Sequence, residues 1–229
     1  MQWLKQLDQE LLLFFNSFHN DFWDKAVTLF TSIEIWIPFY LLLAYTIIKT
    51  FKRNAIYILI LIALAITLSD QFAGLIKSLV QRQRPTQDPV LGSLVHNIYN
   101  RGGRFGFFSA HAANAFTITI IATRLFKNRF FSILMFTWAI LVSYTRIYLG
   151  LHYPGDVLAG LIWGILTGLA FYRLMVYVQR EHFTANPPEI ARTSIAHEDA
   201  MRLILFLMIY VTTILVTINR LTKYHFFSS

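Results

Sequence analysis

The chain has 229 residues, of which 56% are hydrophobic and only 14% are charged, and phenylalanine alone occurs 21 times. This composition excludes an ordinary soluble domain, because several nearly uncharged stretches approach or exceed the ~18 apolar residues that suggest a membrane span. A net charge of +8 without a soluble basic domain argues against a nucleic-acid partner, and the absence of cysteine excludes disulfides, a thiolate nucleophile and cysteine metal sites.

The N-terminal segment is predicted to be an amphipathic helix. Between residues 3 and 18 the apolar side chains recur every three or four positions, whereas Lys5, Asp8 and Glu10 lie off that face. A helix of this kind suits the interface between lipid and water, where its apolar face is buried among the headgroups.

Six apolar segments follow, and they predict an all-α, polytopic transmembrane helix bundle. At ~1.5 Å per residue the second segment exceeds a ~30 Å hydrocarbon core, so its Lys77 end should reach the headgroups. A polar linker at about 180–200 contains Pro187 and Pro188, which cannot continue a helix. The predicted spans are about 33–49, 54–79, 109–124, 130–149, 154–178 and 203–219.

The chain is expected to have three parts: a membrane domain at 1–178, a polar linker at 179–201, and an extra span with a tail at 202–229. If the spans alternate in direction, the basic turns at 49–54 and 124–129 share one side of the membrane. The polar loop at 80–108 and the turn at 146–156 then share the other side. The segments that are rich in polar groups therefore gather at one membrane surface.

Two cations lie near the end of the second span. Lys77 and Arg84 are seven residues apart, which is two helical turns. Pro85 disfavours helix at the residue before it, so Arg84 is expected to lie on the loop. Taken alone, the pair is more typical of a solvated basic helix end.

A serine and a histidine begin the third predicted span. Ser109 is a candidate N-cap, which places His111 in the first turn among unpaired backbone N–H groups. Such a helix start binds phosphate readily. A lone histidine there is more often only a polar residue at the interface.

The remaining polar cluster surrounds the start of the fifth span, where Pro154 suits the first helical position. Arg146 and His152 precede this helix, and Asp156 lies in its first turn. A histidine and a carboxylate four residues apart can form the hydrogen bond that orients an imidazole for attack. The alternative is a capping aspartate beside an interfacial histidine, but three such clusters on one face of a charge-poor chain indicate a site.

These segments resemble the motifs of the type 2 phosphatidic acid phosphatase family, which also includes vanadium-dependent haloperoxidases. The Lys, six residues, Arg-Pro motif is complete, and the Arg, His and Asp motif is complete with Thr145 in place of Ser. In the Pro-Ser-Gly-His motif, Phe108 replaces Pro and Ala110 replaces Gly, which bears on the pocket rim and substrate choice. The resemblance covers roughly residues 1–178.

The resemblance implies that Lys77, Arg84 and Arg146 clamp the phosphoryl oxygens. Ser109 and the backbone N–H groups of Ala110 and the following residue would add hydrogen-bond donors. Together these groups would neutralise the charge that spreads over the oxygens during phosphoryl transfer.

The resemblance also implies a covalent mechanism, and no metal or cofactor is expected. His152 attacks phosphorus, Asp156 holds its ring, and His111 protonates the leaving oxygen and then activates water. The two histidines need opposite protonation states, so we expect a bell-shaped pH profile. Because this face offers chiefly Asp156 and Asp88 as metal ligands, full activity in excess chelator is predicted.

The implied function is that of an integral membrane phosphatase for a phosphorylated lipid. Undecaprenyl diphosphate is preferred as the substrate on family resemblance, with lipid A phosphate and phosphatidylglycerol phosphate as alternatives. The resemblance implies a bacterial cytoplasmic membrane with the site facing outward, as in the family's bacterial members. The turns at 49–54 and 124–129, which hold three basic residues each and no acidic residue, agree with this orientation.

Two other functions and one further residue stay open. A non-catalytic lipid transporter would need the cations but not the His152–Asp156 pair, and a haloperoxidase would resemble soluble relatives, which this chain does not. Asp70 lies within the second span, seven residues before Lys77, so it either anchors the Lys77 side of the site or links helices.

Overall fold

The structure is a computed structural model that describes residues 2–98, 102–182 and 189–223. Every regular element in these ranges is a helix. The described residues also contain an isolated antiparallel β-bridge between Gln83 and Phe105. The prediction of an all-α membrane bundle is confirmed.

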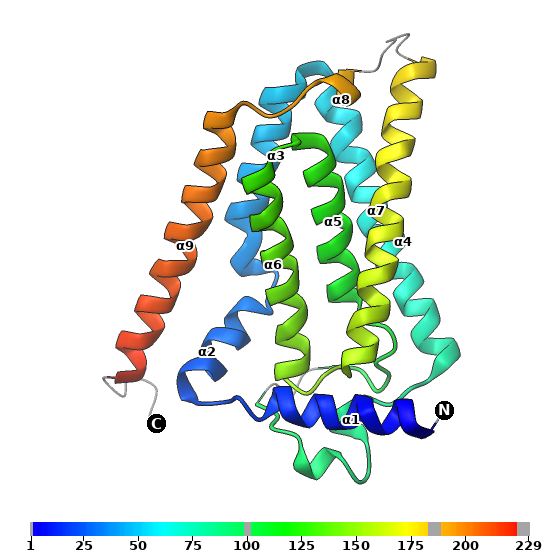
Figure 1. Cartoon of the computed structure of the whole chain (residues 1–229), viewed down its shortest axis with the longest axis vertical. Coiled ribbons are helices and arrows are strands. Elements are labelled where there is room, and N and C mark those ends of the chain that lie inside the picture. The colour runs from blue at the N-terminus through cyan, green and yellow to red at the C-terminus, as the bar shows by residue number, and fades with distance from the viewer. Residues whose placement is uncertain (1, 99–101, 183–188, 224–229) are drawn as a thin grey trace.

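The long helices of the bundle run along the long axis of the molecule (Figure 1). Within the described residues, four stretches are long and apolar enough to cross a membrane, and the first of them joins two helices through the turn at 52–54. α5 has 17 residues and is shorter than these stretches. The stretches are Glu34–Val80, Arg129–Tyr148, Pro154–Glu181 and His197–Lys223. The long helices are α3 Ile37–Phe51, α4 Ala55–Val80, α5 Ala110–Phe126, α6 Arg129–Tyr148, α7 Pro154–His182 and α9 His197–Lys223.

The N-terminal helix α1, Gln2–Asn16, lies across the lower end of the bundle in Figure 1. Its Leu12 is buried, whereas Trp3 and Phe14 are exposed, as expected of a helix that rests in the interface. A second short helix, α2 Asp21–Phe30, was not predicted. Asn20 caps α2 by accepting a hydrogen bond from the Trp23 backbone N–H at 3.0 Å.

Close packing of α5 against α7 brings two motif segments together. A Cβ atom at Gly160 would lie 2.4 Å from the Ser109 carbonyl oxygen, and one at Gly164 would lie 2.3 Å from the Ala113 carbonyl oxygen. The helices approach this closely only because glycine has no side chain, a common device in membrane bundles. The starts of α5 and α7 are therefore held side by side.

The opposite end of the bundle holds the chain that leads to α9. The Lys127 ammonium donates to the carbonyl oxygens of Ile190, Ala191 and Thr193 at 2.8, 2.8 and 2.9 Å, around the short helix α8 at Glu189–Arg192. α7 extends four residues beyond its predicted end at 178, to His182. Pro187 and Pro188 lie outside the described residues.

Candidate active site

The candidate site lies at the lower end of the bundle in Figure 1, where α4 ends and α5 and α7 begin. Helix α4 ends as Gln81 takes the left-handed conformation, with φ of 52°. Arg84 then has extended backbone, with φ of −68° and ψ of 156°, so it lies on the loop as Pro85 predicted. Its side chain is only 8% exposed.

The loop after α4 pairs with the segment before α5. The Arg84 N–H donates to the Arg104 carbonyl at 3.2 Å, and the Gly106 N–H donates to the Arg82 carbonyl at 2.8 Å. A Cβ atom at Gly106 would lie 3.2 Å from Asp156 Oδ2 and 3.3 Å from Arg84 Cγ. Sequence reasoning did not single out Gly106, although the site has almost no room for a side chain there.

The nucleophile candidate His152 lies in a tight turn before α7. The N–H groups of Leu151 and His152 both donate to the Arg146 carbonyl, at 3.0 and 3.2 Å. Arg84 Nη1 donates to the Leu151 carbonyl at 3.3 Å, which ties the first motif to this turn. The Arg146 guanidinium donates to the Thr31 hydroxyl, a residue at the end of α2 that the sequence did not indicate.

His152 and Asp156 are both buried, with 2% and 0% of their surface exposed. Pro154 begins α7 and Asp156 lies in its first turn, as predicted. His152 Nδ1 and Asp156 Oδ2 are 3.7 Å apart, which is longer than a hydrogen bond. The predicted contact is therefore present as a close approach, and the expected hydrogen bond is not formed in this structure.

The three predicted cations all act on His152. Burial lowers the pKa of the His152 imidazole well below its usual value, and the charges of Arg146, Arg84 and Lys77 lower that pKa further. A backbone hydrogen bond with Gly106 acts in the opposite direction on the pKa. Burial and the three cations thus favour the neutral form of the His152 imidazole, which suits a nucleophile that attacks an anionic group.

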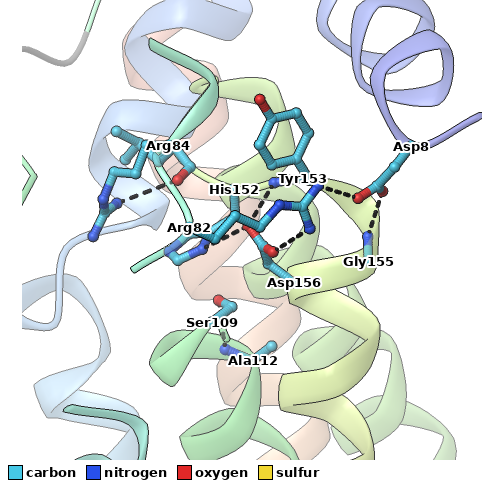
Figure 2. Close-up of polar contacts among 10 residues, drawn as sticks. Asp8, Arg82, Arg84, Ser109, Ala112, His152, Tyr153, Gly155 and Asp156 are labelled. Carbon is cyan, nitrogen blue, oxygen red and sulfur yellow. Dashed lines mark hydrogen bonds and ion pairs between the residues drawn. The ribbon is translucent and has the colours of Figure 1, made fainter. Parts of the chain in front are cut away.

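The start of α5 faces this cluster, as Figure 2 shows for Ser109. Ser109 is the N-cap, and its hydroxyl accepts from the Ala112 N–H at 3.4 Å, as predicted. The Ser109 N–H donates to the Asp156 carbonyl at 3.0 Å. His111 is in electrostatic contact with His152, and Ala110 lies beside it at the helix start. The structure thus brings all eight predicted site residues to one end of the bundle.

The unusual phenylalanine of the second motif packs into the bundle. Phe108 is 4% exposed, and its ring centroid lies 6.2 Å from those of both Phe72 on α4 and Trp163 on α7. Phe72 and Trp163 stack on each other at 3.8 Å. Phe108 therefore closes an aromatic cluster between two helices that border the site.

Asp70 makes no hydrogen bond or ion pair with the described residues, and its side chain is exposed. It borders an apolar cavity that also reaches His111. The charge of Asp70 acts on Lys77 without a direct ion pair, and a link from Asp70 to another helix is not visible among the described residues. Across the described ranges, no group of three or more histidine and acidic residues is placed to hold a metal ion.

Arg82 is the main charged residue that sequence reasoning missed. Its guanidinium binds Asp156 Oδ1 through Nη1 at 2.7 Å and Asp8 Oδ2 through Nη2 at 2.6 Å (Figure 2). Asp8 comes from α1, more than seventy residues earlier in the chain. No local sequence pattern indicates such a contact, because it depends on how α1 lies across the bundle.

Known proteins resemble this chain over most of its length. A model of the PAP2 superfamily matches residues 55–180. The lipid A 4'-phosphatase of Bacteroides thetaiotaomicron is 44% identical over 177 residues, which are 75% of this chain and 78% of the relative. The lipid A 4'-phosphatase of Porphyromonas gingivalis is 26% identical and covers 82% of this chain and 81% of its own.

Two further proteins are similar. The undecaprenyl-diphosphatase BcrC of Bacillus subtilis is 33% identical over 85 residues, 37% of this chain and 43% of the relative. The crystal structure of a transmembrane PAP2-type phosphatidylglycerolphosphate phosphatase from Bacillus subtilis has a TM-score of 0.62 at 18% identity. That match covers 80% of this chain and 90% of the other, and it shows a shared fold.

The fold and these relatives together define a polytopic membrane protein of the phosphatase class, and the predicted site residues lie at one end of its helix bundle. The family model covers more than half of the chain, and the chain therefore belongs to the PAP2 superfamily. It is a multi-pass bacterial membrane phosphatase that acts on lipid phosphates. The predicted family and enzyme class are confirmed.

Proposed function

We propose that this phosphatase hydrolyses a phosphate of lipid A, or of a similarly polyacylated lipid, through a phosphohistidine at His152. The observation that carries the proposal is a buried histidine and carboxylate beside cations that form no direct ion pair with a carboxylate of the described residues. Arg84 and Lys77 form no ion pair in the part of the chain that the structure describes, although Arg84 is almost fully buried. Cations in that setting are stabilised by an anionic ligand such as a phosphate.

In the proposed first step, His152 attacks phosphorus and the bond to the lipid oxygen breaks. Because Nδ1 lies on the Asp156 side, Nε2 is the attacking atom. His111 donates a proton to the leaving lipid oxygen, and Asp156 stabilises the positive charge that develops on the His152 ring. The bound phosphate favours the protonated form of His111, since its negative charge lies close to the ring.

In the proposed second step, water hydrolyses the phosphohistidine. His111, now neutral, removes a proton from the water, and the phosphorus–nitrogen bond breaks to release inorganic phosphate. Lys77, Arg84 and Arg146 stabilise the charge on the phosphoryl oxygens in both steps. A lipid transporter that only holds a headgroup needs neither the buried Asp156 nor a second histidine.

An apolar cavity of about 420 Å³ supports a lipid substrate. It lies between α3, α4 and α5, and His111 and Asp70 border it near the site. Its wall continues along α4 as far as Leu59, about 16 Å from Asp70 at about 1.5 Å per residue. The cavity therefore leads from the phosphate-binding end into the depth of the bilayer, where an acyl chain lies.

A second apolar cavity, of about 610 Å³, lies between α2, α6 and α9. It shares Trp36, Trp138 and Val142 with the first, so the two are neighbours. Two adjacent apolar cavities suit a lipid with several acyl chains, and two relatives that cover most of this chain are named as lipid A 4'-phosphatases. We further propose that α9, an addition to the membrane domain at 1–178, serves to line this second cavity.

A polyprenyl diphosphate is the second candidate substrate. The match to the undecaprenyl-diphosphatase BcrC favours it, but that match covers only 37% of this chain. The family resemblance favoured undecaprenyl diphosphate as the substrate. The matches that cover more of the chain favour lipid A phosphate instead. For either lipid we propose that the site faces outward, because the basic turns at 49–54 and 124–129 lie at the other end of the bundle.

The direct test is phosphate release by purified protein from lipid A, undecaprenyl diphosphate and phosphatidylglycerol phosphate at equal surface concentration. We expect the highest kcat/KM with lipid A phosphate, and a loss of release to the background rate in His152→Ala. A higher kcat/KM with undecaprenyl diphosphate would overturn the substrate proposal. Normal release by His152→Ala would overturn the mechanism.

The cavity is tested by filling it. Ala44 lines the first cavity, and Ala44→Trp should lower kcat/KM for a long-chain lipid about tenfold or more while soluble 4-nitrophenyl phosphate is hydrolysed as before. Ala63→Trp is the matched control, because Ala63 is exposed on the outer side of α4. Equal effects of the two substitutions would show that the cavity does not take the lipid chain.

A further inference from the structure

Arg82 joins three separate parts of the chain at one guanidinium group. Nη1 binds Asp156 Oδ1 at 2.7 Å, and Nη2 binds Asp8 Oδ2 at 2.6 Å (Figure 2). The other oxygen of Asp8 accepts a hydrogen bond from the Gly155 N–H at 2.7 Å. The interfacial helix α1, the loop after α4 and the first turn of α7 therefore meet beside the nucleophile.

Arg82 differs from the cations of the phosphate clamp. Its two terminal nitrogens each bind a carboxylate, whereas Lys77 and Arg84 form no direct ion pair among the described residues. Arg82 Cζ also lies 4.0 Å from the centre of the Tyr153 ring, which supports the flat face of the guanidinium. A planar group held by two carboxylates and an aromatic ring has a single orientation.

This orientation fixes the carboxylate of Asp156. Arg82 binds Oδ1, and the Tyr153 N–H donates to Oδ2 at 3.1 Å. The same Oδ2 is the atom that lies 3.7 Å from His152 Nδ1. Because both oxygens have fixed partners, the carboxylate cannot rotate away from the imidazole without breaking one of these contacts.

The contact between α1 and α7 leaves no room for a side chain at its centre. A Cβ atom at Gly155 would lie 2.9 Å from Asp8 Oδ2. The Asp8 side chain is only 14% exposed, although its neighbours Leu4 and Leu7 on α1 are exposed. Asp8 therefore faces the site while the apolar residues beside it face the surroundings.

We infer that Arg82 and Asp8 are positioning residues for phosphate transfer, and that α1 is thereby a working part of the active site. Arg82 sets the orientation of Asp156, and Asp8 sets the orientation of Arg82. The inference rests on the proposed function, since it requires Asp156 to act on His152 as a nucleophile. The terminal nitrogens of Arg82 and both oxygens of Asp8 are bound within the protein, so loss of either residue should slow the chemical steps and leave substrate binding intact.

The first experiment compares Asp8→Asn with Glu10→Gln in full-length protein and a fixed lipid mixture. Asn has the shape of Asp but no charge, and Glu10 is exposed on the same helix. We expect Asp8→Asn to lower kcat about tenfold, with KM within about twofold of the wild-type value, because a misplaced catalytic group slows chemistry. Glu10→Gln should retain the wild-type kcat and KM.

The second experiment tests whether Asp8 and Arg82 affect kcat through the same contact. Arg82→Lys keeps the positive charge but cannot bind both carboxylates in one plane, and we expect kcat to fall about 10- to 100-fold. Adding Asp8→Asn to Arg82→Lys should lower kcat by less than about twofold more, because the contact is already broken. Thermal melting of each variant shows whether the fold is retained.

Three results would overturn the inference: an unchanged kcat in folded Asp8→Asn, effects that multiply in the double variant, or a raised KM with constant kcat. The last result would make Arg82 a phosphate ligand. The rate at which 4-nitrophenyl phosphate labels His152 separates this inference from the proposed function. Slower labelling of His152 in Asp8→Asn supports the inference, whereas a wild-type enzyme that is never labelled contradicts the proposed function itself.

Discussion

The two ends of the helix bundle hold their basic side chains in different ways. At the end with α8, Lys49 binds Asp199 at 2.7 Å, and the Lys127 ammonium donates to three backbone carbonyls. At the other end, Lys77 and Arg84 have no ion-pair partner in the described ranges, although Arg84 is nearly buried. The charges at the α8 end have their partners within the chain and stabilise the fold, whereas we propose that Lys77 and Arg84, which have no such ion-pair partner in the part of the chain that the structure describes, bind the substrate anion.

The largest effect should come from removing a cation that has no ion-pair partner among the described residues. Arg84→Ala should lower kcat/KM about 10²- to 10³-fold, because one donor to the developing charge on the phosphoryl oxygens is lost. The melting temperature should fall only modestly, since the variant loses one hydrogen bond to the Leu151 carbonyl and leaves no carboxylate without an ion-pair partner. A steady-state assay with a melting curve measures both, and a folded variant with wild-type kcat/KM would contradict the assignment.

The next effect concerns the close approach at Gly106. Gly106→Ala places a methyl group 3.2 Å from Asp156 Oδ2, and the carboxylate must shift, so kcat should fall about 10- to 100-fold. Gly103→Ala in the same loop is the control, because nothing lies within 4 Å of its added Cβ. Kinetic assays of the two variants should differ; equal rates would show that Asp156 tolerates movement.

The pH dependence offers a smaller and more specific test. Neutral imidazole is the attacking form, and burial together with Arg146, Arg84 and Lys77 lowers the pKa of His152 below 6.5. The acidic limb of kcat/KM should therefore lie below pH 6.5 in the wild-type enzyme. In Arg84→Gln one positive charge is gone, so the pKa of His152 rises and this limb moves to higher pH. A limb that stays in place would show that another group titrates.

The smallest effect on activity should come from a substitution at the end of the bundle with α8. Lys127→Ala removes hydrogen bonds to three carbonyls, so stability should fall by about 1–3 kcal/mol, while kcat/KM stays within about twofold of wild type. Thermal melting and the lipid assay measure the two quantities. A large loss of activity in a variant that keeps its melting temperature would remove the distinction between the two ends.

Local rules predicted much of the site. Pro85 placed Arg84 off the helix, Ser109 was correctly predicted as a cap, and Pro154 marked the start of α7. These features depend on the chemistry of one or two adjacent residues, which the sequence states directly. The spacing of Gly160 and Gly164 also indicates close helix packing, since small residues four positions apart let two helices approach each other.

Contacts between distant segments could not be predicted. Asp8 and Asp156 share Arg82, and Thr31 binds Arg146, because α1 and α2 fold under the bundle. The sequence of one segment does not indicate which distant segment it will contact in the fold. The metal-free mechanism also stays a prediction, and full activity in excess chelator is the outcome expected for it.

The central claim is a covalent bond between phosphorus and His152. His111→Ala should accumulate this intermediate from 4-nitrophenyl phosphate, because nitrophenolate leaves without an acid while hydrolysis lacks its base. Rapid quenching at high pH, followed by peptide mass spectrometry, should find phosphate on His152 at close to one per enzyme. Phosphate on another residue, or none while 4-nitrophenol is still released, would contradict the account.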